Sequence, residues 1–330
     1  KGRAIVNLLN LEKDEKVAEC LAIRDFDQEG YYVVMATRSG LVKKTPLEQY
    51  SRPKRGGIIA IKLRDGDELV EAKVVGPRDE VILVTSKGMA IRFRESDARP
   101  MGRNTSGVKG IGLVGDDYVV GMVVADPGAT LLTVCENGYG KRTYFGPNAD
   151  DAAPESDDDS AATDPAATED ENSSDDSSGA EEVSSASGAR YRTQKRGGKG
   201  LRDIRTSDRN GKVIGIARVD QGDEIFMMTA KGKIQRIAAD DINVIGRNTQ
   251  GVRIMNVDDG DSLIAVVRVP AEEESPEEVS TEDTVDAVEV VATEGSEASA
   301  EASPDAASPD SPAADTQTDA ANETDEPGEE

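Results

Sequence analysis

The sequence predicts an all-β fold: a propeller-like array of four-stranded blades with a disordered acidic insert and a disordered acidic tail. Three observations predict it, namely a repeat of about 50 residues, about four strands in each repeat, and the near absence of helical periodicity. A small sheet that recurs at a fixed spacing can bury its faces only against its neighbours. We therefore expect a core that is divided among the blades.

Four segments share one plan, which consists of a continuous β-branched run, a tight turn ending in glycine, and a second strand of alternating apolar and polar residues. They begin at Tyr31, Asp79, Ala129 and Asp223, and their turn glycines are Gly40, Gly88, Gly138 and Gly232. Each segment continues through a basic, glycine-rich loop into another strand, a turn and a long final strand. This plan predicts about four strands in each unit.

The spacing of the loop glycines gives the length of the repeat. The intervals between Gly57, Gly107, Gly197 and Gly251 are 50, 90 and 54 residues. The long interval contains a 41-residue acidic stretch, and removing it leaves 49. The insert therefore interrupts a regular array.

The chain divides by composition. We expect residues 1–147 to form the first part of the array and residues 189–270 the remainder. Residues 148–188 and 271–330 are rich in Asp, Glu, Ser, Ala and Pro, so they are predicted to be disordered. The first five residues align with the segment Lys109 to Leu113, which indicates a chain that begins inside a repeat, as an N-terminally truncated fragment would.

The net charge of −26 is an average over unlike segments. The insert and the tail contain 14 and 21 of the 65 acidic residues and no Lys or Arg. The part predicted to fold keeps 30 acids and all 39 bases, a net charge of +9. A basic body suits contact with phosphate. For the acidic segments, salt adaptation, a regulatory mimic of DNA and a plain solvated linker all remain open.

A basic residue stands four positions after the turn glycine in every repeat. We predict that these cations and their strand neighbours form a positive rim that binds duplex DNA, against the alternative of ordinary solvated strand faces. This set is Lys43, Lys44, Arg92, Arg94, Lys141, Arg142 and Arg236.

The glycine-rich loops add a second basic row, because glycine lets the backbone approach a phosphate closely. The predicted DNA-binding residues of the loops are Lys54, Arg55, Arg103, Lys109, Arg192, Lys195, Arg196, Lys199, Arg247 and Arg253. Few aromatic residues interleave with these cations, so stacking on single strands is the weaker hypothesis.

No catalytic residues are predicted. The chain has no histidine, which excludes Ser-His triads and His-metal chemistry, and no metal site is expected. Tyr191 follows Arg190, as a DNA-cleaving tyrosine would, but it lies between an acidic linker and an all-β repeat. Cys20 and Cys135 are expected to be inert core residues. No apolar run is long enough to span a bilayer, so we expect a cytoplasmic protein without membrane contact.

One motif resembles a known family. The box Gln194, Lys195, Arg196, Gly197, Gly198, Lys199 and Gly200 matches at every position the box that marks the C-terminal domain of the DNA gyrase A protein. The resemblance extends over roughly residues 1–147 and 189–270, in segments such as GRAIVNLLNLEKDE, ENGYGKRT and IGRNTQGV. In that family the full box lies in the first blade, whereas here it follows the acidic insert.

The resemblance implies a β-pinwheel that wraps double-stranded DNA around its basic edge and so supports ATP-dependent negative supercoiling. It implies a domain that is not catalytic by itself and belongs to a type IIA topoisomerase. The implied partners are the remainder of the gyrase A protein and the gyrase B protein, in an A2B2 assembly. ATP and Mg would serve other parts of the enzyme, in the cytoplasm at the nucleoid. The alternatives are the equivalent domain of topoisomerase IV and, in another class, a propeller-like scaffold that binds proteins.

Overall fold

The computed structural model describes residues 11, 15–54, 56–149 and 190–271. The chain separates into two units, residues 1–274 and 275–330, and every described residue belongs to the first. The predictions of disorder concern segments that lie outside the described residues, apart from Asn148, Ala149 and Ala271 at their boundaries.

Strands dominate the described part of the chain, as predicted. They are β1 (Tyr32–Thr37), β2 (Leu41–Pro46), β3 (Leu69–Val75), β4 (Glu80–Thr85), β5 (Met89–Arg94), β6 (Val108–Lys109), β7 (Val119–Val124), β8 (Thr130–Cys135), β9 (Tyr139–Tyr144), β10 (Leu201–Arg202), β11 (Val213–Val219), β12 (Glu224–Thr229), β13 (Ile234–Ala238), β14 (Val252–Arg253) and β15 (Leu263–Val269). Three short 3-10 helices follow hairpins, namely η2 (Leu47–Tyr50), η3 (Glu95–Asp97) and η5 (Ala239–Asp241).

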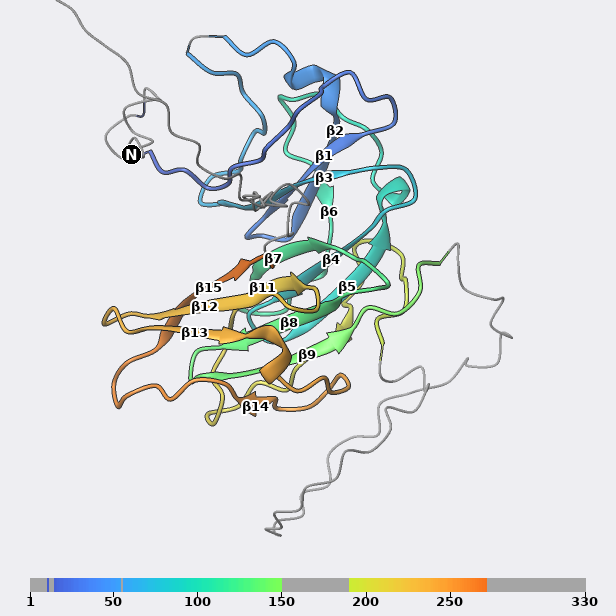
Figure 1. The fold of residues 1–330 in the computed structure, drawn as a ribbon. Coiled ribbons are helices and arrows are strands. Elements are labelled where there is room, and N and C mark those ends of the chain that lie inside the picture. Colours follow the sequence, from blue (N-terminus) through green and yellow to red (C-terminus); the bar gives the residue numbers. More distant parts are fainter. Residues whose placement is uncertain (1–10, 12–14, 55, 150–189, 272–330) are drawn as a thin grey trace, which may run out of the picture. The chain divides into compact units, whose positions relative to one another are not determined.

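These strands form four antiparallel sheets, which we call blades 1 to 4. Their strand orders are β3-β1-β2-β6, β10-β5-β4-β7, β11-β8-β9-β14 and β13-β12-β15. Each blade contains one of the predicted hairpins, and its long final strand pairs with the first strand of that hairpin, as β11 does with β8 (Figure 1). The prediction of a repeated four-stranded unit is thereby confirmed for three blades, and the fourth has three strands within the described residues.

The short fourth strand of a blade comes from the following repeat, which the sequence reasoning did not foresee. β6 follows the second hairpin in the chain but pairs with β2 of blade 1. In the same way β10 pairs with β5, and β14 with β9. Consecutive blades are thus joined by backbone hydrogen bonds as well as by side chains.

The short strands β6 and β10, which pair with the preceding blade, identify the correct loop glycine of the third repeat. Gly200 has a φ of +81°, and a Cβ atom built on it would lie 2.4 Å from the carbonyl oxygen of Ala90. Gly107 meets Val42 in the same way, also at 2.4 Å. The equivalent loop glycine of the third repeat is therefore Gly200 rather than Gly197. The intervals between Gly57, Gly107, Gly200 and Gly251 are then 50, 93 and 51 residues. Without the 41-residue insert the middle interval is 52.

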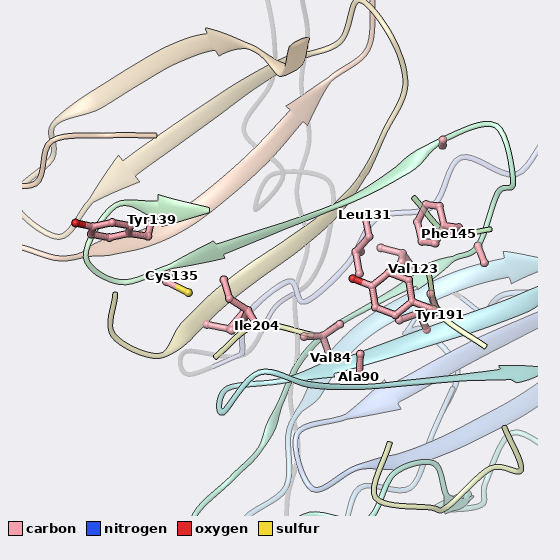
Figure 2. Packing of buried hydrophobic residues seen from close by; sticks show 13 residues of the cluster. Val84, Ala90, Val123, Leu131, Cys135, Tyr139, Phe145, Tyr191 and Ile204 are labelled. Atoms are coloured by element: carbon pink, nitrogen blue, oxygen red, sulfur yellow. The ribbon is translucent and has the colours of Figure 1, made fainter. Parts of the chain in front are cut away.

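The core lies between blades. In β4, Ile82 and Val84 pack toward blade 3, whereas Val81 and Leu83 pack toward blade 1. Figure 2 shows Val84 on one side and Leu131 of β8 on the other side of such a cluster. Both faces of an inner blade are buried, which explains why its first strand reads as a continuous apolar run instead of an alternating one.

The long final strands β3, β7, β11 and β15 contact one another from blade to blade. We call the opposite edge of each sheet, where β6, β10 and β14 lie, the outer edge. Blade 4 buries one face against blade 3. On its other face Met228 and Ile234 remain 40% and 58% exposed, although their counterparts Val84 and Ala90 in blade 2 are fully buried.

Candidate nucleic-acid interface

Four of the cations predicted to form a rim are instead buried. The exposed fractions are 0% for Lys43, 4% for Lys44, 1% for Arg92 and 0% for Lys141. A side chain with no access to solvent cannot reach a duplex on the surface, so the prediction that these four bind DNA is wrong. The strands that contain them, β2, β5 and β9, have a neighbouring strand on either side. Those of blades 2 and 3 have a blade on each face, whereas blade 1 has blade 2 on one face and its own loops with the segment before β1 on the other.

The recurring cation joins one blade to the next. Arg92 pairs with Glu80 of its own blade at 2.5 Å and donates to the carbonyl oxygens of Phe145 and Tyr191 at 2.7 and 3.1 Å. Burial lowers the pKa of the Arg92 guanidinium from its ordinary value, and the Glu80 carboxylate opposes that shift. In blade 1, Lys44 pairs with Glu95 of η3, which belongs to the second repeat.

The neighbouring lysines also hold the interior together. Lys141 pairs with Asp203 at 2.9 Å and donates to the carbonyl oxygen of Gly246 at 3.0 Å. The ammonium of Lys43 donates to the carbonyl oxygen of Ala60. Desolvation, with a smaller contribution from Arg103, lowers the pKa of Lys43 to about 8. Buried charges of this kind need such partners, because an unpaired ion in the interior is costly.

The other two members of the register are less buried. Arg142 pairs with Asp240 at 3.0 Å and donates to the carbonyl oxygen of Ile242, both in the fourth repeat. Arg236 repeats the pairing of Arg92 through Glu224, but its side chain is 58% exposed. Arg94, at the end of β5, is half-buried.

A second register of cations is exposed at the outer edges. The short strands β6, β10 and β14 each have a half-buried aliphatic residue followed by an exposed base. These bases are Lys109, Arg202 and Arg253. The sequence reasoning missed Arg202, because it used Gly197 as the loop glycine. Measured from Gly200, the base stands two positions after the glycine, as it does after Gly107 and Gly251.

The box lies along the outer edge between blades 1 and 2. The amides of Gly112 and Gly197 donate to the carbonyl oxygens of Gly198 and Gly110, each at 2.7 Å. The guanidinium of Arg196 donates to the carbonyl oxygens of Lys109 and Asp97. The structure therefore uses the glycines and Arg196 to join the two blades.

The remaining box residues differ in exposure. The backbone amide of Gln194 donates to the carbonyl oxygen of Arg92 at 2.8 Å. The backbone of Gly200 lies close to Ala90 of β5. Lys195 and Lys199 are exposed. Only these two lysines of the box leave their charge directly available to a ligand.

The other predicted loop cations are distributed as follows. Lys54 and Arg192 are exposed, whereas Arg103 and Arg247 are half-buried, and Arg55 lies outside the described residues. Burial lowers the pKa of Arg247, which lies near Tyr191 and Asp203. The exposed set at the loops and outer edges is the surface that could meet an anionic ligand.

The structure offers no support for cleavage chemistry at Tyr191. This side chain is 3% exposed, and its hydroxyl donates to Asp203 at 2.5 Å. Burial raises its pKa well above the ordinary value. Within the described ranges no cluster of three or more His, Cys, Asp or Glu could hold a metal ion. No helix in the same residues has the length and apolar character of a membrane span.

The two cysteines differ in burial. Cys135 is buried, as predicted, and burial raises the pKa of its thiol to about 12. Cys20 is exposed, so the prediction of a core position is wrong for it, because the segment before β1 lies on the surface of blade 1 with only alternate residues turned inward.

Comparison with known proteins agrees with this architecture. The family model of the DNA gyrase C-terminal domain, described as a beta-propeller, matches residues 31–75, 79–126, 187–220 and 223–270. Among curated relatives, the DNA gyrase A protein of Klebsiella oxytoca is 37% identical over 297 residues, 90% of this chain. That of Haloquadratum walsbyi is 36% identical over 282 residues, 84% of this chain. The chain spans 28% of the length of either relative.

Two solved structures share the fold. A DNA gyrase A C-terminal domain is 25% identical with a TM-score of 0.61, covering 81% of this chain and 75% of that one. A C-terminal domain of DNA topoisomerase IV has a TM-score of 0.65 at 22% identity, covering 82% of this chain and 72% of that one. The four matched segments take up more than half of the sequence, and each contains the long final strand of one blade. The fold is thus a β-pinwheel, and the chain belongs to the DNA gyrase C-terminal domain family.

Proposed function

We propose that this chain binds and wraps duplex DNA along the outer edges of its blades, as part of a DNA gyrase A protein. The observation that supports the proposal is the exposed base at one register of three successive outer edges: Lys109, Arg202 and Arg253. A cation repeated in one position of a repeated sheet can follow a phosphate backbone without reading bases. Lys195 and Lys199 of the box extend this row between blades 1 and 2.

This assignment implies partners for the chain and a division of activities among them. We propose that the chain works together with the remainder of the gyrase A protein and with the gyrase B protein, in the A2B2 assembly, in the cytoplasm at the nucleoid. Strand cleavage, ATP hydrolysis and Mg binding then belong to those other parts. The contribution of this chain is to bend DNA and to stabilise one hand of the wrap.

A plasmid assay tests the proposal. Relaxed circular DNA is incubated with increasing amounts of the chain and a nicking-closing enzyme, and the linking number is then read from topoisomer ladders. Wrapping of one hand should shift the distribution in proportion to protein. The triple variant Lys109→Gln, Arg202→Gln and Arg253→Gln should lose most of the shift.

Arg78→Gln provides a matched control, because Arg78 is an exposed arginine between β3 and β4, at the strand ends opposite the hairpin turns. It should behave as the parent chain does. An unshifted ladder at every concentration of the parent chain would contradict the proposal.

The same variants separate the alternatives. A scaffold that binds proteins would not need the outer-edge bases, so their neutralisation would leave its partner binding intact. The topoisomerase IV domain shares the fold and remains an alternative, and supercoiling by the reconstituted whole enzyme would distinguish it. Neutralising Lys44 and Arg92 cannot serve this purpose, because both are buried between blades.

A further inference from the structure

Two guanidinium groups converge on Tyr139 at the outer edge of blade 3. Arg253 donates to the Tyr139 hydroxyl at 2.9 Å and Arg209 at 3.3 Å. Their guanidinium carbons lie 5.3 and 5.1 Å from the centre of the tyrosine ring. Since both donors share one oxygen, the two donating nitrogen atoms are at most about 6 Å apart, the combined length of the two bonds.

This pair lacks a counter-ion within the described part of the chain. Neither Arg209 nor Arg253 forms an ion pair there, and the acceptor that they share is a neutral phenol. Their hydrogen bonds, first that of Arg209, lower the pKa of Tyr139, so the local field favours a negative charge at this point. Two like charges held this closely repel each other, and an anion bound to both would offset that repulsion.

The geometry is built by three segments that are distant in sequence. Arg253 on β14 stands opposite Tyr139 on β9 in the strand register. The backbone of Arg209 is held by Asn137, whose amide donates to the carbonyl oxygens of Asp208 and Arg209 at 3.0 and 3.3 Å. Both arginines are exposed, and Figure 2 shows the Tyr139 hydroxyl turned away from the other labelled side chains.

The acidic side chain of Glu136, next to Asn137, is engaged elsewhere. Its carboxylate accepts from the backbone amide of Lys212 at 2.9 Å. The backbone beneath Tyr139 is tightly packed: a Cβ atom on Gly138 would lie 2.1 Å from the carbonyl oxygen of Met255. The pair is therefore presented on a rigid edge.

We propose that Arg209, Tyr139 and Arg253 form a clamp for one phosphodiester group of duplex DNA. The inference rests on the proposed function and adds a specific anchoring point to it. Planar guanidinium groups bind phosphate oxygens through paired N–H donors, and the tyrosine orients both of them. Blades 1 and 2 have no equivalent, because Leu41 and Met89 stand opposite their single edge cations.

Salt dependence of duplex binding tests the clamp. Fluorescence anisotropy would measure the dissociation constant of the whole chain over a series of salt concentrations. Arg209→Gln and Arg253→Gln should each weaken binding roughly 10-fold at low salt and reduce the salt slope by about 0.9, the contribution of one phosphate. The double variant should reduce the slope by the same amount, because both arginines hold the same phosphate. A reduction of about 1.8 would indicate two separate contacts and overturn the clamp.

Two further variants isolate the tyrosine and the charge. Tyr139→Phe keeps the ring and removes the shared acceptor, so binding should weaken by about 2- to 3-fold with little change in slope. Arg78→Gln removes the same charge at the opposite strand ends and should leave both quantities unchanged. Thermal unfolding of each variant checks that the fold is retained.

The outcomes separate the clamp from the proposed function. If Lys195→Gln/Lys199→Gln weakens duplex binding and the arginine variants do not, the clamp is overturned and DNA binding by the outer edges stands. If the parent chain binds no duplex, both are overturned. Saturation by inorganic phosphate in a calorimetric titration, without competition against duplex, would assign the arginines to a free anion and also overturn the clamp.

Discussion

Arg92 and Arg202 lie on neighbouring strands of blade 2, yet their surroundings are opposite. Arg92 on the inner strand β5 is 1% exposed and bonded to Glu80 and two carbonyl oxygens. Arg202 on the outer strand β10 is exposed. The difference shows that the position of a strand within the sheet, rather than the periodicity of the cation, decides whether an arginine joins blades or faces a ligand.

The largest effect should follow loss of the inner cation. Arg92→Met would leave the Glu80 carboxylate buried, with hydrogen bonds from Thr193 and the backbone amide of Ala149 as its remaining ones among the residues that the structure describes. We expect the free energy of unfolding in urea to fall by about 3–5 kcal/mol, the usual cost of breaking a buried ion pair. The double variant Glu80→Gln/Arg92→Met should recover part of this loss. A loss below about 1 kcal/mol for the single variant would contradict a joining role for Arg92.

Neutralising the outer register should act on binding instead of stability. The triple variant Lys109→Gln, Arg202→Gln and Arg253→Gln should reduce the salt slope of duplex binding by about 2.7, which is three phosphates at about 0.9 each. Its free energy of unfolding should change by no more than about 0.5 kcal/mol per substitution. Marked destabilisation of this variant would erase the distinction between the two registers.

The free energy of unfolding should also depend on pH, through the carboxyl group of Glu71. Burial and a hydrogen bond with Glu19 raise the pKa of Glu71 to about 7, although Lys73 pairs with it at 2.6 Å. The folded state then retains a proton that the unfolded state releases, so stability should fall as pH rises from about 4.5 through about 7. Urea unfolding at both ends of this window should differ by on the order of 1 kcal/mol, since the Glu71 side chain is 22% exposed and solvent screens its charge.

Glu71→Gln provides the control, because it cannot titrate. It should remove most of this pH dependence and leave the salt dependence of DNA binding unchanged. An identical pH profile for the variant and the parent chain would exclude Glu71 as its source.

The smallest effect is expected at Arg236, the fourth member of the inner register. Arg236→Met removes an ion pair with Glu224 whose arginine is 58% exposed. Pairs of this kind contribute about 0.2–1 kcal/mol, so the midpoint of urea unfolding should move far less than for Arg92→Met. Equal losses for the two variants would mean that burial is not what separates them.

Much of the fold could be predicted from the sequence. The β-branched runs and turn glycines such as Gly88 and Gly138 indicated the hairpins, and both glycines have the positive φ that such turns require. The period of about 50 residues indicated the array. What a single sequence could not provide was the pairing partner of the short strand after each loop, since Val108 has the same local pattern whether it pairs within its own repeat or with the previous one.

The same limitation explains the errors at the site. Alternation placed Arg92 and Arg94 on one face of a strand, and a charged face is ordinarily solvated. Burial arises because the next blade covers that face and brings the carbonyl oxygens of Phe145 and Tyr191 with it. Those partners are 53 and 99 residues away, so no local pattern could indicate them.

Because the short fourth strand of a blade comes from the following repeat, the blades are completed in chain order during synthesis. The edge of β5 stays open until β10 has left the ribosome, and 106 residues separate Arg94 from Leu201. At ordinary rates of elongation this wait lasts about 5–20 s. It is about 1.7 times the wait for blade 1, where 61 residues separate Pro46 from Val108, because the acidic insert must be translated first. An unpaired edge is a template for wrong pairing, so the nascent chain is most exposed to misassembly while the insert is being made.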